Sequence, residues 1–433
     1  MNLRTLLIAE ACNPEWVSIP LEGWSLSRAI SQLTDAHLVT QIRNRDALLR
    51  AGLVEGKDFT AIDSEAIARR THKLAWALGG AQGKGWTLNT ALSALSYRYF
   101  EKLLWQQFGP RISAREFDLV HRISPSSPTI PSRLASLCKN ASVPMILGPL
   151  NGGLPWPPGF DYARRREREW LSYVRGAYRM LPGSRATLLD ATAIIAGSRH
   201  TASQQPPDIA DKCFYIPENG IDPSRFSIQR ARRTERPLRA VFVGRLVPYK
   251  GPDMLLEAAA PLVAAGDLTI DVIGDGPMKP ELVQMATDHG LSEKVRFPGW
   301  LNHAELPSRL ADADLLTFPS IREFGGAVIL EAMAVGVVPV IVDYGGPAEL
   351  ATEKTGFLIP LAKRPQIIAN LRQILSKLVT HPELIDRRSP LARQRALEHF
   401  SWSAKAKDVL RVYQWTCRPD QNTKPIFTTP KPD

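Results

Sequence analysis

The chain has 433 residues, of which 44% are hydrophobic and 22% are charged, and its formal net charge is +11. This length predicts two or three domains, and the composition is that of a globular protein with full hydrophobic cores. Its apolar runs fall short of the roughly 18 residues that a membrane-spanning helix requires. No zinc-finger, RNA-binding or heptad pattern accompanies the positive charge, so the sequence disfavours nucleic acid as a partner.

The positive charge is concentrated in the first part of the chain. Residues 1–200 carry 25 Lys and Arg against 16 Asp and Glu, whereas the remaining residues carry 29 against 27. Residues 161–185 contain seven arginines, with Trp170, Tyr173 and Tyr178 between them. This segment predicts either a basic amphipathic helix on an anionic membrane surface or a solvated helix with its own ion pairs. The pattern alone leaves both interpretations open.

The cysteines indicate a reducing compartment. The four cysteines are far apart and form neither a metal-binding spacing nor a disulfide framework. The N-terminus lacks the long apolar region of a signal peptide. We therefore expect a cytoplasmic protein, held at the inner face of the cell membrane if residues 161–185 bind lipid.

Strand patterns alternate with helical patterns in the first half of the chain, which predicts a Rossmann-like domain. Short apolar runs predict strands at residues 5–9, 37–42, 117–123, 143–147 and 192–196. Ligands bind beyond the carboxyl ends of the strands in such sheets. The candidates there are Gly23 after the first strand, His121 near the end of the third, and Gly152 and Gly153 after the fourth. A structural role is the alternative for a single histidine.

A glycine-rich stretch at residues 79–86 does not fit a phosphate-binding loop. A Walker A motif needs Ser or Thr after its Gly-Lys, and Gly85 follows Lys84 in this chain. We expect either a basic lip over an acceptor site or a flexible connection between helices.

Two cations lie in one loop of the second half. Residues 238–243 form a predicted strand, and the loop 244–251 contains Arg245 and Lys250 before a helix that starts at Pro252. Arginine binds phosphate oxygens in a bidentate manner, and lysine adds a point charge. The loop therefore predicts a site for a diphosphate.

A strand, a glycine loop, a helix and a second strand follow later in the chain. An apolar run predicts the first strand at residues 315–318. Gly325 and Gly326 open a helix that ends near Gly336, and residues 337–342 form the second strand. A loop of this kind directs free backbone N–H groups outward at the start of a helix.

Two glutamates lie in this unit, Glu323 and Glu331, with seven residues between them. Glu323 lies in the loop, and Glu331 is the only charged residue within residues 327–338. A carboxylate in so apolar a helix needs hydrogen-bond donors, and the hydroxyls of a nucleotide sugar are suitable. The alternative is that Glu331 caps a neighbouring backbone or pairs with an arginine.

The spacing Glu323-x7-Glu331, followed by an apolar strand and Gly345-Gly346, resembles the signature of glycosyltransferase family 4. The resemblance covers most of residues 217–415, including the Gly-Arg-x4-Lys-Gly loop. One departure is that the family usually has Glu-Gly-Phe-Gly where this chain has Glu-Phe-Gly-Gly. Members of the family are retaining enzymes with nucleotide-sugar donors, and they have the GT-B fold, two Rossmann-like domains facing across a cleft.

The resemblance implies roles at the donor. Arg245 and Lys250 would stabilise the charge on the departing diphosphate, His121 would reach the donor, and Glu323 would bind the donor sugar, all four as catalytic residues. Glu331 would bind the ribose hydroxyls. The other donor contacts that the resemblance implies are Gly244, Gly274, Gly276, Phe324, Gly325 and Gly326.

The resemblance also implies an acceptor side and no cofactor. Gly23, Gly152 and Gly153 would lie in acceptor or cleft loops. No metal is expected, because protein cations and a helix N-terminus can carry the leaving charge. Asp312-Ala313-Asp314 precedes a strand instead of following one, so we do not expect it to bind a metal.

The predicted organisation is an α/β protein with two Rossmann-like domains and a C-terminal helix that crosses back to the first domain. The predicted segments are an acceptor domain at 1–205, a linker at 206–237, a donor domain at 238–399, a crossover helix at 400–417 and a disordered tail at 418–433.

The predicted activity is transfer of a sugar, with retention, from a UDP- or GDP-linked donor to a glycan or lipid-linked acceptor, as in cell-surface polysaccharide or glycolipid synthesis. Two alternatives stay open. A sugar-nucleotide epimerase of the same fold would isomerise the donor without an acceptor. A non-catalytic scaffold would bind the sugar nucleotide and never release the diphosphate.

Overall fold

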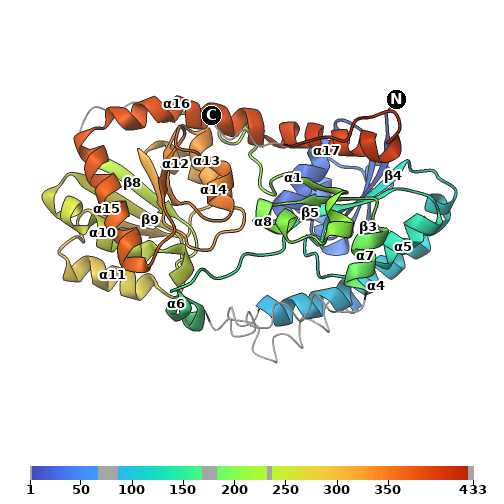
Figure 1. Cartoon of the computed structure of the whole chain (residues 1–433), viewed down its shortest axis with the longest axis horizontal. Coiled ribbons are helices and arrows are strands. Elements are labelled where there is room, and N and C mark those ends of the chain that lie inside the picture. Colours follow the sequence, from blue (N-terminus) through green and yellow to red (C-terminus); the bar gives the residue numbers. More distant parts are fainter. Residues whose placement is uncertain (1, 67–85, 168–182, 232–236, 428–433) are drawn as a thin grey trace. The chain divides into compact units, whose positions relative to one another are not determined.

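The structure is a computed structural model that describes most of the chain as two compact units (Figure 1). The described residues are 2–66, 86–167, 183–231 and 237–427, with the backbone alone for 86–95. Among them, the first unit contains residues 2–66, 86–153, 183–218 and 402–427. The second unit contains residues 154–167, 219–231 and 237–401.

The first unit is built on a seven-stranded parallel sheet with the order β3-β2-β1-β4-β5-β6-β7. Its strands are β1 Arg4–Ala9, β2 Asp35–Gln41, β3 Phe59–Ile62, β4 Leu119–Ser124, β5 Met145–Leu150, β6 Ala193–Ala196 and β7 Cys213–Tyr215. Its helices are α1 Ile19–Ser31, η1 Ile42–Asn44, α2 Arg45–Arg50, α4 Trp86–Ser113, α5 Arg133–Asn140, α7 Ser184–Asp190, α8 Arg199–Ser203, α9 Pro207–Ala210 and α17 Trp402–Cys417.

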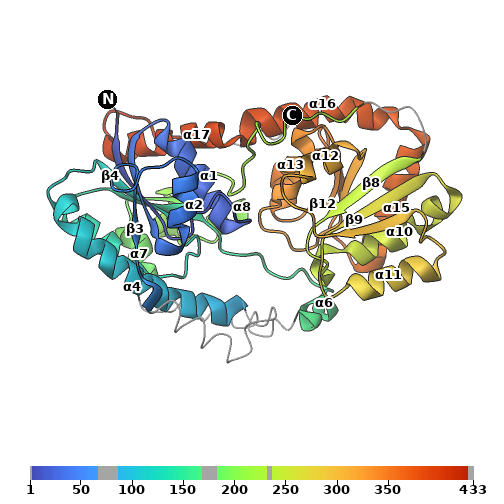
Figure 2. The same cartoon turned by 180° about the vertical axis from the view of Figure 1, so that it is seen from behind.

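Helices cover both faces of this sheet. Successive side chains of a strand point to opposite faces, and both sets are apolar, so each face needs a layer of helices. Leu7 of β1 packs in one buried cluster with Leu26 of α1 and Val409 of α17. Ile8 packs in the other cluster with Phe100 of α4. Figure 2 shows α1 and α17 on one side of the sheet and α4 on the other.

The second unit has a six-stranded parallel sheet with the order β10-β9-β8-β11-β12-β13. Its strands are β8 Leu238–Val243, β9 Leu268–Ile273, β10 Val295–Gly299, β11 Leu315–Phe318, β12 Val338–Val342 and β13 Phe357–Ile359. Its helices are α6 Asp161–Arg166, η5 Pro248–Lys250, α10 Pro252–Ala265, α11 Lys279–Asp288, α12 Leu306–Ala311, α13 Ala327–Ala334, α14 Gly346–Leu350, α15 Arg364–Thr380 and α16 Glu383–Phe400. One buried cluster unites strands and helices, including Leu255 of α10 with Leu371 of α15, and Leu330 of α13 with Ala392 of α16.

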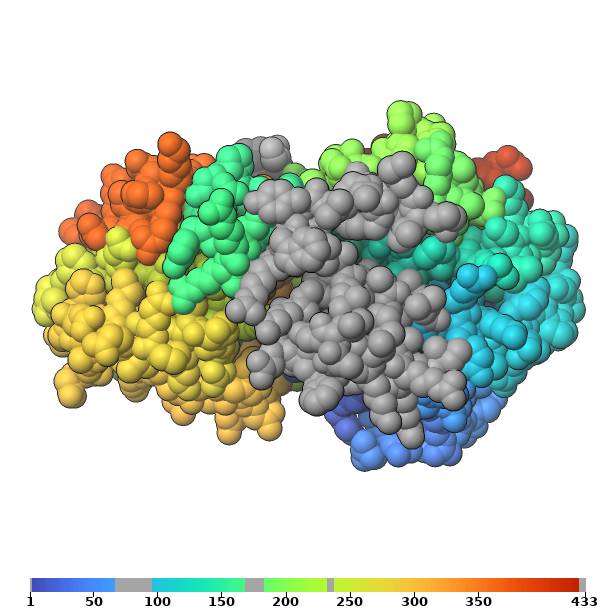
Figure 3. Space-filling model, turned by 90° about the horizontal axis from the view of Figure 1, so that it is seen from below, coloured from blue at the N-terminus to red at the C-terminus, as the bar shows by residue number. Residues whose placement is uncertain are grey.

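Residues 154–167 belong to the second unit, although the sequence placed them in the first domain. Phe160 and Ala163 are buried in the core of the second unit, and Arg166 pairs with Glu281 of α11. The Arg322 side chain also donates a hydrogen bond to the Leu154 carbonyl at 3.0 Å. Figure 3 shows these residues, in green, against the yellow surface of the second unit. The predicted domain boundary is therefore wrong here, because apolar burial attaches the segment to the later sheet.

The predicted linker is also divided between the units. Residues 206–218 include α9 and the edge strand β7 of the first unit, and residues 219–231 belong to the second. The chain returns to the first unit at Trp402, where α17 begins, as predicted for the C-terminal helix.

The predicted disorder at the C-terminus is wrong for residues 418–427. The Phe427 ring packs edge-on against Phe214 with 6.2 Å between centroids, and the Arg411 guanidinium lies 4.9 Å from the Phe427 centroid. Apolar contact therefore fixes the part of this tail that the structure describes.

Several predicted features lie partly or wholly outside the described residues. They include the loop at 79–86, of which only Trp86 is described, and residues 168–182 of the arginine-rich segment. In the described portion of the chain, no helix combines the length and apolar character needed to cross a bilayer.

A buried ion pair connects three elements of the second unit. The Arg230 guanidinium is 2.7 Å from Asp314 Oδ1, and the two side chains are only 4% and 1% exposed. Asp314 Oδ2 accepts a hydrogen bond from the Arg239 backbone N–H at 2.9 Å. Asp386 of α16 also contacts Arg230 at 3.2 Å. Asp314 therefore has a structural partner at each oxygen, in keeping with the prediction that it is not a metal ligand.

We predict that Asp314→Ala destabilises the second unit by about 3 kcal/mol, because it leaves a buried guanidinium without its main partner. Urea unfolding measures this loss. The double change Arg230→Met with Asp314→Leu removes both charges and should recover much of the stability. If Asp314→Ala were as stable as the native protein, this ion pair would not stabilise the second unit.

Candidate functional site

Both sheets reverse their strand order at a defined point. In the second unit, β8 lies between β9 and β11, so the loops after β8 and β11 lead to opposite sides of the sheet. Crevices at such switch points, beyond the carboxyl ends of the strands, are where open α/β sheets bind ligands. The loops that carry Arg245, Lys250 and Glu323 follow these two strands.

The loop after β8 is held against the loop after β9. Gly244 N–H donates to the Ile273 carbonyl at 3.0 Å, and Leu246 N–H donates to the Asp275 carbonyl at 2.8 Å. Gly274 has a φ of +133°, and a Cβ there would lie 2.0 Å from the Gly244 carbonyl oxygen. Glycine is required at this position because the two backbones touch.

Lys250 and Glu323 meet at the switch point. The Lys250 ammonium donates to Glu323 Oε2, and both side chains are 16% exposed. Glu323 Oε1 accepts from the Gly326 backbone N–H at 3.2 Å. The Lys250 ammonium also lies 5.0 Å from the Phe318 ring centroid, a cation–π distance. The sequence nominated both residues separately and did not predict that they pair.

The predicted glycine loop and helix are confirmed. Gly326 has a φ of +76° at the start of α13, and Gly336 has a φ of +84° just after the helix ends. The predicted strand at residues 315–318 coincides with β11. Phe324 and Gly325 lie in the loop between them and are partly buried.

Glu331 has a partner that was not predicted. Its Oε1 is 3.0 Å from His303 Nε2, and the Glu331 side chain is 13% exposed. The Arg225 guanidinium donates to the other ring nitrogen, His303 Nδ1. Neither backbone capping nor a direct arginine pair accounts for Glu331, because a histidine lies between it and Arg225. The one available signal is that His303 follows the carboxyl end of the strand β10, where parallel sheets bind ligands.

An aromatic group from residues 154–167 completes this region of the second unit. The Trp156 ring lies edge-on to Tyr249 with 6.1 Å between centroids, and the Arg322 guanidinium is 4.9 Å from the Trp156 centroid. Burial, with the Glu323 charge nearby, raises the pKa of Tyr249 to about 12. The Tyr249 hydroxyl therefore stays neutral. Sequence reasoning missed Trp156 because nothing local indicates that it joins the later sheet.

Arg245 remains available to a ligand. Its side chain is exposed, and it makes no ion pair with another described residue. It lies in the loop that joins β8 to η5, five positions before Lys250. The structure thus offers one unpaired cation and one paired cation at the same loop.

His121 does not lie in a ligand site. The residue is fully buried, Nε2 is 2.7 Å from the Gly148 carbonyl oxygen, and Nδ1 is 2.6 Å from the Tyr413 hydroxyl. The carbonyl can only accept, so Nε2 donates and Nδ1 accepts from the tyrosine. Burial lowers the pKa of His121 to about 4. The predicted catalytic role is therefore replaced by a structural one, which attaches α17 to β4 and β5.

Gly23 is a packing residue instead of a loop residue. It lies inside α1, and a Cβ there would come within 2.2 Å of the Ala11 carbonyl oxygen. The helix starts at Ile19, earlier than predicted, so the glycine faces the backbone that follows β1. Gly23 was predicted in an acceptor or cleft loop, and the structure places it in a helix, where it lines a small pocket with Ser124 and Pro149.

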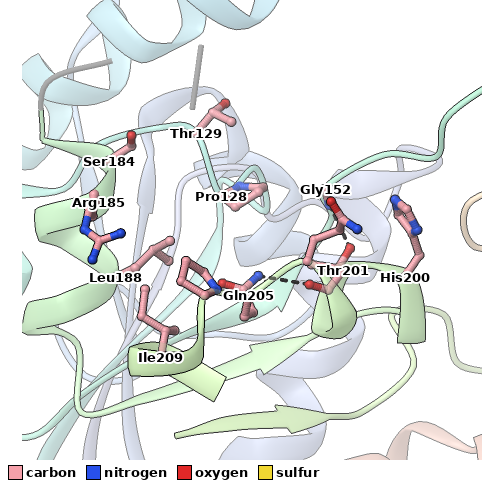
Figure 4. A pocket seen from close by; sticks show the side chains of 12 residues that line it. Pro128, Thr129, Gly152, Ser184, Arg185, Leu188, His200, Thr201, Gln205 and Ile209 are labelled. Carbon is pink, nitrogen blue, oxygen red and sulfur yellow. Dashed lines mark hydrogen bonds between the residues drawn. The ribbon is translucent and has the colours of Figure 1, made fainter. Parts of the chain in front are cut away.

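Gly152 lines a cavity of about 230 Å³ in the first unit (Figure 4). The cavity lies beyond the carboxyl ends of β4, β5 and β6, because its walls come from the segments that follow these strands. Gly152 N–H donates to Thr201 Oγ1 at 3.0 Å, and Gly153 N–H donates to Asn151 Oδ1 at 2.9 Å. The sequence therefore located a loop of this cavity, although it did not predict the cavity itself.

The lining of this cavity is mixed. Pro128, Leu188 and Ile209 supply apolar surface, as Figure 4 shows, and Pro206 adds to it. The polar groups around them are Thr129, Ser184, Arg185, His200, Thr201, Gln204 and Gln205. The Arg185 charge is balanced by Asp208, 2.7 Å away. A small polyhydroxylated molecule with one apolar face has the chemistry that these walls can bind.

The described residues hold no group of three or more His, Cys, Asp and Glu side chains placed to bind a metal ion. At the loops after β8 and β11, the Lys250 ammonium pairs with the Glu323 carboxylate, and the Arg322 guanidinium lies over the Trp156 ring.

Comparison with known proteins relates the second unit to one family. Residues 224–388 match the family described as Glycosyl transferases group 1. Alpha-D-kanosaminyltransferase from Streptomyces kanamyceticus is 28% identical over 220 residues, 49% of this chain and 56% of that protein. D-inositol 3-phosphate glycosyltransferase from Salinispora tropica is 34% identical over 219 residues, 47% of this chain and 44% of that protein. The chain thus spans about half the length of these curated relatives.

A likeness to solved structures extends over nearly the whole chain. The crystal structure of Anabaena Alr3699/HepE in complex with UDP has a TM-score of 0.60, with 16% identity, over 96% of this chain and 100% of that chain. At this identity the likeness shows the fold. That fold is the predicted GT-B class, with a Rossmann-like sheet in each of two domains.

We predict that His121 makes the native protein sensitive to acid. The unfolded chain binds a proton on this histidine near pH 6.5, whereas the folded protein does so only near pH 4. Its stabilising effect is complete above pH 6.5 and is lost as the pH falls toward 4. Between pH 7.5 and pH 5 the loss should be about 2 kcal/mol of unfolding free energy, at about 1.4 kcal/mol per pH unit below 6.5.

Urea unfolding of His121→Gln at both pH values tests this. The variant should be less stable at pH 7.5, because the Tyr413 and Gly148 contacts are disturbed, and should lose less stability on acidification. His381→Gln is the matched control, since that side chain is 56% exposed. An unchanged pH dependence in His121→Gln would contradict the assignment.

Proposed function

We propose that the protein transfers a sugar from a nucleotide-sugar donor to an acceptor hydroxyl, because residues 224–388 match the family of group 1 glycosyl transferases. The observation that carries the proposal is the meeting of Lys250, Glu323 and the start of α13 at the switch point of the second sheet. Departure of a nucleoside diphosphate is the step that needs positive charge, and this crevice supplies it.

The diphosphate would bind to Arg245 and Lys250. Arg245 is exposed and unpaired among the described residues, so it can bind phosphate oxygens with both guanidinium nitrogens. Lys250 is already held in place by Glu323, which fixes its ammonium before the donor arrives. Such preorganised donors stabilise the leaving charge without reorganising during the reaction.

The two glutamates would bind the sugars of the donor. Glu331 would accept hydrogen bonds from the ribose, since within the described chain only His303 occupies one of its oxygens. Glu323 would contact the transferred sugar from the loop that also holds Lys250. A UDP-linked donor is the version that we propose, because the structure of similar fold from Anabaena was solved with UDP.

The acceptor would bind in the first unit. We propose the cavity beside Gly152 as the site of its reacting sugar, because the walls combine apolar surface with hydroxyl, amide and imidazole groups. We further propose that transfer retains the configuration of the sugar and needs no metal. The proposed acceptor is a glycan or a lipid-linked molecule of cell-surface polysaccharide or glycolipid synthesis, and the proposed location is cytoplasmic and adjacent to the membrane. NMR of the product anomer tests retention, and excess EDTA in the assay tests the need for a metal.

We predict that Arg245→Ala and Lys250→Ala each lower the rate of UDP release about 100-fold or more, as loss of one preorganised donor does. The assay follows UDP release from UDP-sugars with and without a panel of monosaccharide acceptors. Lys377→Ala, which removes an exposed lysine from α15, is the matched control and should keep full activity.

The outcomes of this assay separate the proposal from its alternatives. Full activity in both loop variants would contradict the proposed diphosphate site. If NMR shows that the donor sugar is isomerised while no UDP is released, the protein is an epimerase. Binding of UDP without either reaction would indicate a scaffold.

We predict that filling the cavity blocks the acceptor and not the donor. Leu188→Trp places an indole into the cavity wall, whereas Leu189→Trp changes the next residue, which is 39% exposed and lies outside the lining. In Leu188→Trp, the stimulation of UDP release by acceptor sugars should fall at least about 10-fold, because the indole occupies the volume in which the sugar would contact the cavity wall. UDP affinity, measured by calorimetry, should stay unchanged in both. Equal stimulation in the two variants would place the acceptor elsewhere.

A further inference from the structure

Glu331 is the terminal member of a chain of three polar side chains from different segments. Arg225 lies in the segment that enters the second unit, His303 in the loop after β10, and Glu331 in the middle of α13. Arg225 contacts His303 Nδ1, and His303 Nε2 is 3.0 Å from Glu331 Oε1. Glu331 belongs to the predicted glutamate spacing, whereas Arg225 and His303 lie outside it.

The chemistry of Arg225 decides the direction of both hydrogen bonds. A guanidinium has five N–H donors and no acceptor, and it stays protonated in proteins. His303 Nδ1 must therefore accept, which leaves the ring proton on Nε2. Nε2–H then donates to Glu331 Oε1. The imidazole is a neutral donor in this arrangement, because a proton on Nδ1 would oppose the Arg225 N–H.

Packing holds the imidazole in this orientation. The Phe226 ring lies edge-on to His303 with 6.3 Å between centroids, and Phe226 is 2% exposed. Arg225 follows a turn closed by Asp222, whose Oδ1 accepts from the Ser224 backbone N–H at 3.0 Å. The ring is therefore fixed by an edge contact, by a cation at one nitrogen and by a carboxylate at the other.

One oxygen of Glu331 is left for a ligand. Oε1 is held by His303, and no other residue in the described ranges hydrogen-bonds to Oε2. Oε2 therefore keeps its lone pairs for hydrogen-bond donors of a ligand. A fixed carboxylate with one open oxygen is suited to neighbouring hydroxyls, and it loses little side-chain entropy when they bind.

We propose that Arg225 and His303 are positioning residues that lock Glu331 for recognition of the ribose hydroxyls of the donor. This inference rests on the proposed function, in which Glu331 binds the ribose. It adds that the selection of ribonucleotide over deoxyribonucleotide depends on a histidine tautomer set by an arginine from another segment.

The test compares UDP with 2′,3′-dideoxy-UDP, using calorimetry on the full chain. His303→Ala should weaken UDP binding about 10-fold and leave dideoxy-UDP binding within about twofold, because only the hydroxyls use Glu331. His303→Gln, whose amide can still donate to Glu331, should recover most of the UDP affinity. Arg225→Met should fall between the native protein and His303→Ala. His289→Ala, in the same unit and after α11, is the control.

A second readout reports the tautomer directly. ¹⁵N NMR of imidazole-labelled protein should show His303 protonated at Nε2 and bare at Nδ1, and Arg225→Met should disturb that pattern. The opposite tautomer in the native protein would overturn the inference. Equal losses for UDP and dideoxy-UDP in His303→Ala would also overturn it, since a merely structural role affects both ligands alike.

The same data distinguish failure of the inference from failure of the proposed function. Native protein that binds no nucleotide contradicts the proposed function. Native protein that prefers UDP to dideoxy-UDP, with a preference unchanged in His303→Ala, supports the donor site and overturns only the role of His303.

Discussion

The reversal of strand order between β8 and β11 is the constraint on which the candidate donor site depends. Two adjacent parallel strands send their following loops to opposite sides of the sheet. Lys250 comes from the loop after β8 and Glu323 from the loop after β11, and their ion pair joins the two loops. The backbone N–H of Gly326, at the start of α13, donates a second hydrogen bond to the Glu323 carboxylate.

The same rule operates in the first sheet, where β1 lies between β2 and β4. There the Ala11 N–H, just after β1, donates to the Oγ of Ser124, the last residue of β4, at 3.0 Å. The larger opening lies further along the sheet, beside Gly152 and Thr201. Two sheets of similar order thus differ in where they leave room, because loop lengths and side chains decide which crevice is filled.

Charge is used differently in the two units. The second unit pairs its buried charges, as Arg230 does with Asp314, and keeps Arg245 exposed at the switch point. The first unit buries His121 in neutral form between a carbonyl and a tyrosine hydroxyl. Both arrangements avoid an uncompensated buried charge, whose cost is several kcal/mol. A polar residue at a strand end can therefore hold the fold together as readily as it can bind a ligand.

Local sequence determined the elements that carry their own signals. The apolar run at residues 315–318 predicted a strand, and Gly326 and Gly336 marked the two ends of a helix. An apolar pattern and a glycine with positive φ each depend on only a few neighbouring residues. The glutamate spacing and the Arg-Lys loop likewise indicated the two loops at which Lys250 and Glu323 meet. These features depend on the backbone near them and not on distant partners.

Tertiary structure decided which side chains meet. His121 and Gly23 have the sequence context of site residues, yet one contacts Tyr413 and the other packs on Ala11. Trp156 and His303 lack such a context, yet they join Tyr249 and Glu331. The sequence by itself determined most of the strands, the glycine turns and the motif loops, and it did not predict the edge strand β3. The folded chain decided partners, protonation and cavities, because these depend on burial and on contacts between residues far apart in the sequence.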